Sequence, residues 1–217
     1  RHLDRLLQLD ALVRPVRQLL EGLDERRAWP HTTLLVVSDH GMVGVTQGLD
    51  AMAPLKKARI RARAIPGAAY ALVYLEDPSQ REAAVAALSA VEEVRAYPAA
   101  AVPERLRFRH PTRTGDVVAL TDPPRTFTRP WSQGAGLLRI SRLFGNAVGA
   151  HGYDPDAHSE MQGIFLALGR GVSAAAILPP VRAIDVAPTV SRLLGIGPPA
   201  HAEGSSIPGI GDGIARD

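Results

Sequence analysis

The chain has 217 residues, of which 46% are hydrophobic and 22% are charged, so it is long and apolar enough to bury the core of a globular protein. It contains no cysteine, which excludes disulfides and thiolate metal sites and leaves histidine and carboxylate side chains as metal ligands. The formal net charge of +3 is too small to indicate binding to a nucleic acid polymer. We also find no apolar run long enough to span a bilayer, so no membrane segment is expected.

The first part of the chain predicts a helix followed by a buried strand. Leucine and valine recur at helical spacing over residues 2–27, and Pro15 predicts either a kink or the start of a second helix. Residues 34–37 are then four apolar residues in a row, two of them β-branched. This pattern is typical of a strand covered on both faces, as in the parallel sheets of α/β proteins.

Metal-binding chemistry follows this strand directly. Asp39 and His40 stand at its carboxyl end, where open α/β sheets place their ligands. Gly41 is expected to let the backbone turn sharply so that both side chains converge on one ion. A carboxylate oxygen and an imidazole nitrogen suit Zn²⁺ or a related divalent ion. These two residues alone are equally compatible with a turn-capping Asp39 and an ordinary polar His40.

Residues 52–145 predict an inserted cap. We expect a β-α-β-β unit there, with strands at residues 69–75, 94–97 and 116–120, and with a helix at residues 78–91 capped by Asp77. Residues 105–113 interleave four arginines with Phe108 and His110, which fits either a nucleic-acid patch or a half-solvated strand, and we favour the strand. Residues 122–145 are rich in Pro, Arg and Gly and predict an irregular loop.

The chain then returns to its core. His151 and Gly152 precede a predicted strand at residues 161–168, and a helix is expected at residues 184–194, with Asp185 as its cap and Gly195 as its stop. The tail from residue 204 is turn-rich. The remaining histidines of this half and of the cap are interpreted as exposed or locally hydrogen-bonded, namely His110, His158 and His201.

Four motifs in this order resemble the alkaline phosphatase superfamily, and most closely its nucleotide pyrophosphatase/phosphodiesterase branch. They are Val-Val-Ser-Asp-His-Gly-Met at 36–42, His-Gly-Tyr-Asp at 151–154, Met-x-x-x-Phe-x-Ala-x-Gly at 161–169, and Ile-Asp-Val-Ala-Pro-Thr-Val from residue 184. The resemblance covers the C-terminal half of such an enzyme. It implies an α/β fold with a mostly parallel sheet flanked by helices, divided into core (1–51), a small α+β cap (52–145) and core return (146–217).

The resemblance also implies a chemistry and a set of site residues. Two divalent ions, which we expect to be zinc, would be bound by Asp39 and His40 on the side of a Thr or Ser nucleophile and by His151 on the other side. Asp154 would support a metal-bound histidine through a hydrogen bond. The nucleophile and the remaining ligands are expected upstream, so this chain alone is expected to be inactive.

The expected activity is hydrolysis of phosphodiester or pyrophosphate bonds in nucleotides or related small esters, with a small-molecule substrate as the partner. Phosphonoacetate hydrolysis, phosphomonoester hydrolysis and a non-catalytic binding role are the alternatives. A periplasmic or secreted location is compatible with the resemblance, and a cytoplasmic one is left open.

Overall fold

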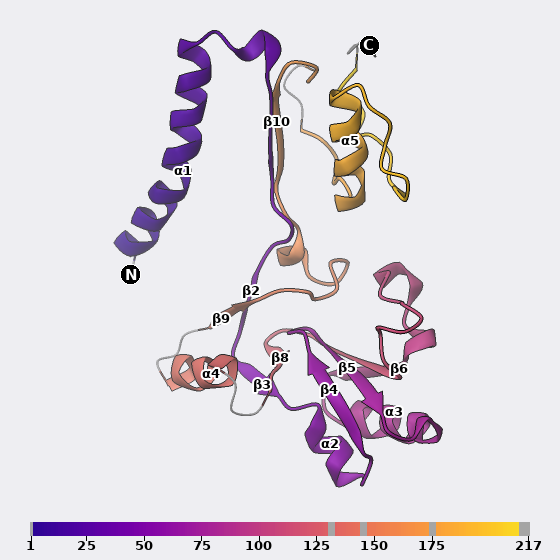
Figure 1. The fold of residues 1–217 in the computed structure, drawn as a ribbon. Coiled ribbons are helices and arrows are strands. Elements are labelled where there is room, and N and C mark those ends of the chain that lie inside the picture. The colour runs from indigo at the N-terminus through magenta and orange to yellow at the C-terminus, as the bar shows by residue number, and fades with distance from the viewer. Residues whose placement is uncertain (1, 130–132, 144–146, 174–176, 213–217) are drawn as a thin grey trace. The chain divides into compact units, whose positions relative to one another are not determined.

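The computed structural model describes residues 2–129, 133–143, 147–173 and 177–212. The chain divides into two compact units (Figure 1). Unit 1 comprises residues 1–39 and 164–217, and unit 2 comprises residues 40–163. Among the described residues, no helix combines the length and apolar character needed to cross a membrane.

Unit 1 begins with one long helix and continues into a strand pair. The helix α1 (His2–Glu25) contains Pro15 in its interior, so no second helix begins at this proline. A 3₁₀ turn (Trp29–His31) leads into β1 (Thr33–Val37), which pairs antiparallel with β10 (Phe165–Gly169). The predicted strand is therefore present at the expected place, and the strand predicted at residues 161–168 forms at residues 165–169.

The surroundings of β1 differ from the sequence-based expectation. Residues 33–36 are half-buried and Val37 is 44% exposed, whereas the sequence predicted a strand covered on both faces. Leu166 and Leu168 of β10 are also exposed. Among the described residues β1 pairs only with β10, so the parallel neighbours expected for this strand are not found there.

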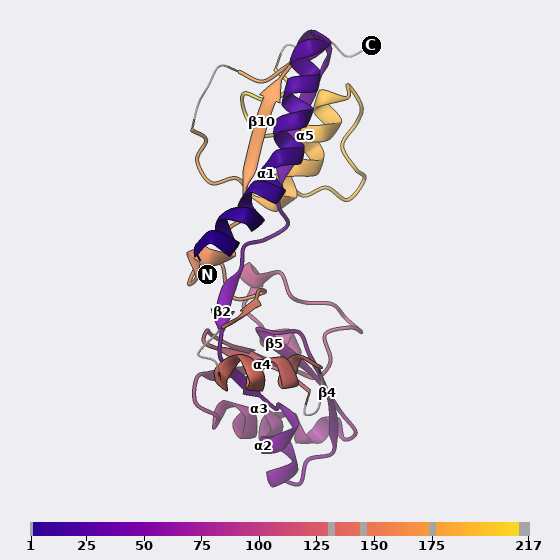
Figure 2. The ribbon, with the colours of Figure 1, turned by 90° about the vertical axis from the view of Figure 1, so that its left-hand side faces the viewer.

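The last helix, α5 (Val186–Leu193), lies beside the β1–β10 pair (Figure 2). It follows a 3₁₀ turn (Ala183–Asp185) and ends before Gly195, which has φ +70° and suits the predicted stop. Asp185 occupies the predicted N-cap position of this helix. Its side chain makes no capping hydrogen bond, because the carboxylate instead accepts from the Arg182 guanidinium and from the backbone N–H of Ser205.

Unit 2 is built around a four-stranded antiparallel sheet. Its strand order is β4 (Ala62–Pro66), β5 (Tyr70–Leu75), β7 (Val117–Thr121) and β6 (Val94–Pro98). The helices α2 (Met52–Lys57) and α3 (Arg81–Ser89) pack on this sheet. Alternate strand residues form the apolar core with the helices, including the fully buried Leu55, Val73, Leu88 and Val117.

The predicted β-α-β-β unit corresponds to β5, α3, β6 and β7, and α2 and β4 are additional elements. Asp77 accepts a hydrogen bond from the backbone N–H of Ser79 at the start of the 3₁₀ turn (Pro78–Gln80) before α3, as predicted for a cap. These elements all fall within the predicted cap range, and the boundaries at residues 52 and 145 stay a prediction.

The predicted strand at residues 105–113 does not form. A 3₁₀ turn (Glu104–Leu106) begins this stretch, and irregular backbone follows it. Arg107 adopts a left-handed φ of 50°, which an extended strand cannot accommodate, and the Arg109 guanidinium bonds the Val102 carbonyl.

The predicted loop at residues 122–145 contains β8 (Arg125–Phe127) and α4 (Gln133–Leu143). β8 pairs in parallel with β3 (Gln47–Leu49), so long-range pairing overrides the turn-rich local composition. Residues 130–132 and 144–146 of this stretch lie outside the described part of the chain.

Candidate metal centre

His40 and His151 lie against each other in unit 2. Their rings stack with centroids 3.7 Å apart and planes inclined by 13°. The short strands β2 (Val43–Val45) and β9 (Val148–Ala150) bring them together, because these strands pair antiparallel with Val43 opposite Ala150. His40 precedes β2 and His151 follows β9, so both stand at the same end of this ladder.

The hydrogen bonding of His40 suits a metal ligand. Its Nδ1 lies 2.7 Å from the backbone carbonyl oxygen of Gly41. A carbonyl oxygen only accepts, so in the neutral ring Nδ1 carries the hydrogen and Nε2 keeps its lone pair. Metal-bound histidines commonly donate their other ring N–H to a carbonyl in this way. The Gly41 carbonyl thus holds the Nδ1 side of the His40 ring.

The two imidazole planes are nearly parallel. Imidazole lone pairs lie in the ring plane, so the lone pairs of the two rings lie in two nearly parallel planes. An ion in the plane of one ring would therefore lie out of the plane of the other. The stacked rings thus do not both direct a lone pair at one ion.

The third predicted ligand, Asp39, is the last residue of the first segment of unit 1 and is exposed. Within the described residues, no group of three or more His, Cys, Asp or Glu side chains is arranged to hold a metal ion. The residues present therefore fit a metal site in part. The assignment of Asp39, His40 and His151 as ligands stays a prediction.

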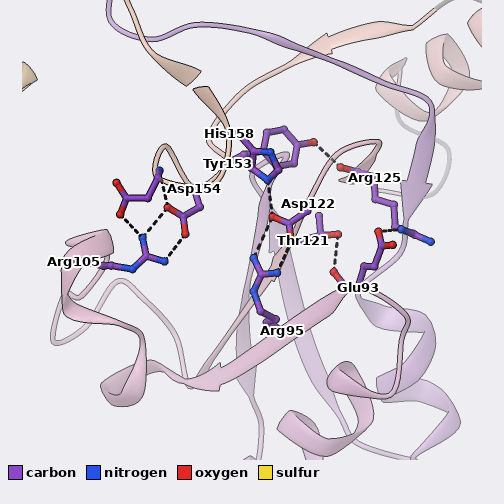
Figure 3. Close-up of polar contacts among 10 residues, drawn as sticks. Glu93, Arg95, Arg105, Thr121, Asp122, Arg125, Tyr153, Asp154 and His158 are labelled. Carbon is purple, nitrogen blue, oxygen red and sulfur yellow. Dashed lines mark hydrogen bonds and ion pairs between the residues drawn. The ribbon is translucent and has the colours of Figure 1, made fainter. Parts of the chain in front are cut away.

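Asp154 is held by an arginine that the sequence analysis did not select. Its carboxylate accepts from both terminal nitrogens of Arg105, at 2.8 and 2.5 Å, and from the backbone N–H of Asp156 at 3.1 Å (Figure 3). Arg105 also bonds the Asp156 carboxylate at 2.8 Å. The Arg105 guanidinium lowers the pKa of Asp154, which is only 13% exposed. The predicted support of a metal-bound histidine by Asp154 stays a prediction.

A second cluster holds His158. Its Nε2 lies 2.9 Å from an oxygen of Asp122, and Asp122 also accepts from the two terminal nitrogens of Arg95 (Figure 3). The hydrogen bonds from Arg95, followed by that of His158, lower the pKa of Asp122. His158 is thus half-buried and hydrogen-bonded to a residue 36 positions away, and not exposed or locally hydrogen-bonded as interpreted from the sequence. No spacing pattern could have selected Arg95 or Asp122, because they lie far from His158 along the chain.

The backbone of Gly41, next to His40, contacts the segment that follows His151. Its N–H donates to the carbonyl of Met161 at 2.9 Å. A Cβ at Gly41 would lie 1.9 Å from the carbonyl oxygen of Glu160 and 2.6 Å from that of Gln162. Glycine was expected here for a sharp turn, and the close approach of the Glu160 and Gln162 carbonyls is a further physical reason for it.

A pocket of about 330 Å³ lies beside this segment within unit 2. Its walls combine sheet residues with the stretch that follows His151, and they include Tyr70, Phe108, Leu120, Arg95, Arg105 and Asp154. The Tyr70 ring rests over Gly67, where a Cβ would lie 2.2 Å from a ring carbon, and meets the Phe108 ring edge-on at 4.6 Å. Both guanidiniums in the wall are paired with carboxylates.

The sequence profile of the type I phosphodiesterase/nucleotide pyrophosphatase family matches residues 2–154. The chain belongs to this family. Membership confirms the resemblance on which the site prediction rests, and the match includes Asp39, His40, His151 and Asp154. No curated protein matches the chain.

Solved structures of family members share the fold. Murine ectonucleotide pyrophosphatase/phosphodiesterase 5 is 23% identical with a TM-score of 0.73, and 90% of this chain is aligned to 49% of that one. The human protein of the same name is 22% identical with a TM-score of 0.70 over the same shares. An inactive variant of the murine protein, in complex with AMP, matches at 23% identity and a TM-score of 0.73. The predicted α/β class is confirmed, and the chain spans about half the length of these structures.

Proposed function

We propose that this chain is part of a metal-dependent hydrolase that cleaves phosphodiester or pyrophosphate bonds in nucleotides or related small esters. The observation that carries the proposal is the stacked pair of His40 and His151 in a chain of this family. The two motifs that the resemblance assigns to metal binding are distant in sequence. Their meeting in the folded chain supports a common site.

Two divalent ions, which we propose to be zinc, would offset the negative charge of the phosphate and hold the attacking and leaving oxygens. His40 would hold one ion through Nε2, because Nδ1 is engaged by the Gly41 carbonyl. Asp39 would add a carboxylate on the same side, and His151 would hold the second ion. A Thr or Ser in a preceding segment would supply the nucleophile.

The substrate class rests on the family and on one neighbour. The inactive murine variant was solved with AMP, which supports a nucleotide or similar small phosphate ester as the substrate here. Only the fold is shared at 23% identity, so we extend the proposal to the ester class and not to a particular nucleotide.

The test compares zinc content and hydrolysis in matched variants. Zinc per chain, measured by atomic emission, should fall in His40→Ala and in His151→Ala. It should stay unchanged in His110→Ala, whose ring nitrogen accepts a local bond from the backbone of Thr112. In a chain extended by the preceding segment, hydrolysis of bis(p-nitrophenyl) phosphate should fall with the zinc.

Two results would count against the proposal. Full zinc content in both His40→Ala and His151→Ala would remove the metal site as assigned. Faster turnover of p-nitrophenyl phosphate than of the diester by the extended chain would favour a phosphomonoesterase instead.

A further inference from the structure

We propose that two polar clamps position His151 by fixing the segment that follows it, residues 151–161, which we call the 151–161 loop. One clamp is Arg105 on Asp154, and the other is the Arg95–Asp122 pair on His158. The inference rests on the proposed function in so far as His151 is a metal ligand. Arg105, Arg95 and Asp122 are positioning residues, since none of them is assigned to the metal.

The first clamp holds the loop three residues after His151. Arg105 grips Asp154 with two nitrogens and reaches Asp156 as well, so one guanidinium fixes two side chains of the loop. Paired N–H bonds to one carboxylate fix orientation as well as distance. The Asp154 carboxylate also accepts from the backbone of Asp156, and thus transmits the position of Arg105 to the loop backbone.

The second clamp holds the loop seven residues after His151. His158 bonds Asp122, which follows β7, and Asp122 is gripped by Arg95 from the neighbouring strand β6 (Figure 3). His158 and Asp122 are 22% and 24% exposed. The backbone N–H of His158 also bonds the carbonyl of Asp154, so the two clamps are joined through one turn of the loop.

Apolar packing and the polar clamps act on different parts of the loop. Tyr153 and Met161 are buried in one apolar cluster with Ala69 and Ala150, so packing fixes the loop at these two positions. Between them, residues 154–156 line the pocket. The clamps hold Asp154 and His158 in this stretch, between the two buried residues.

Two further residues of the loop, Tyr153 and Met161, connect it to the rest of the unit. The Tyr153 hydroxyl donates to the carbonyl of Arg125 at 2.6 Å, and Met161 is buried at the far end of the loop. The Met161 carbonyl accepts from Gly41, next to His40. A shift of the loop would therefore change the position of His151 relative to His40, which is the quantity that metal binding depends on.

The experiment uses this chain with the variants Arg105→Gln and Asp122→Asn, alone and combined. Arg61→Gln is the matched control, because Arg61 forms an exposed ion pair with Glu76 at 3.1 Å within the same unit and outside the loop. Each His ring should shift the proton resonances of the other upfield, since the rings stack at 3.7 Å. This NMR readout requires no metal, and a role in overall stability would not change it at temperatures where the variants stay folded.

We expect the double variant to lose the mutual ring shift and to bind zinc about 10–100-fold more weakly, the usual effect of removing groups that orient a ligand. Each single variant should show a smaller change, and Arg61→Gln should show none. Unchanged ring shifts and zinc affinity in the folded double variant would overturn the inference, and the two single variants decide it if the double variant does not fold. Failure of the chain extended by the preceding segment to bind zinc, with ring shifts that still respond to the clamps, would overturn the proposed function and leave the positioning of His151 supported.

Discussion

Replacing Gly41 by Ala tests most directly whether the close backbone contact between Gly41 and residues 160–162 stabilises the fold. The new Cβ would lie 1.9 Å from the Glu160 carbonyl oxygen and 2.6 Å from that of Gln162. Close C···O contacts are about 3.3–3.6 Å long, so the backbones must separate by more than about 1 Å. This separation breaks the Gly41 N–H bond to Met161. Losing the bond costs about 1 kcal/mol and the overpacking about 1–3 kcal/mol, so we expect a loss of about 2–4 kcal/mol.

The assay is urea unfolding followed by circular dichroism, with Gly136→Ala as the control. Gly136 lies in α4, and a Cβ there would meet nothing within 4 Å. The same chemical change should therefore stabilise the protein by up to about 1 kcal/mol through helix propensity. If Gly41→Ala unfolds within about 0.5 kcal/mol of the wild type, the close approach of residues 41 and 160 does not constrain the native state.

Three further predictions concern stability. Thr189→Val should cost about 1–3 kcal/mol in urea unfolding, because the buried hydroxyl donates to the Asp185 carbonyl and accepts from the Ile207 N–H, and a neutral variant would contradict this. The Arg182 guanidinium lowers the pKa of Asp185, so this carboxylate stabilises the fold above its ordinary pKa, and the contribution disappears as the pH falls through the lower folded value. Asp185→Asn should accordingly lower the melting temperature at neutral pH and flatten its decline below about pH 4, and parallel curves for variant and wild type would refute this role. A chelator should lower the melting temperature of the zinc-loaded chain and leave that of His151→Ala unchanged, whereas equal responses of the two chains would contradict the zinc assignment of His151.

Local patterns in the sequence located several elements correctly. The apolar run at residues 34–37 and the Ala-rich stretch before residue 91 form a strand and a helix, since hydrophobic spacing and propensity act over a few residues. Asp77 caps the turn before that helix for the same local reason. The motifs at residues 36–42 and 151–154 indicated the family, because the type and order of their residues carry information before any folding.

The alternation at residues 105–113 was misread. An alternating pattern predicts a strand only where a partner strand is available, and here the arginines bond carbonyl and carboxylate oxygens of other segments. Asp185 was assigned to a cap for a similar reason, since its position suits one but two other donors compete for its carboxylate.

The sequence by itself determined the family, the candidate ligands and most of the local elements. Only the tertiary structure decided that β1 pairs antiparallel with β10, that the His40 and His151 rings stack, and that Arg105 grips Asp154. Arg105 and Asp154 are separated by 49 residues, and His158 and Asp122 by 36. Contacts of this kind depend on how strands pair and loops close, and neither spacing nor composition along the chain records which distant side chains will meet.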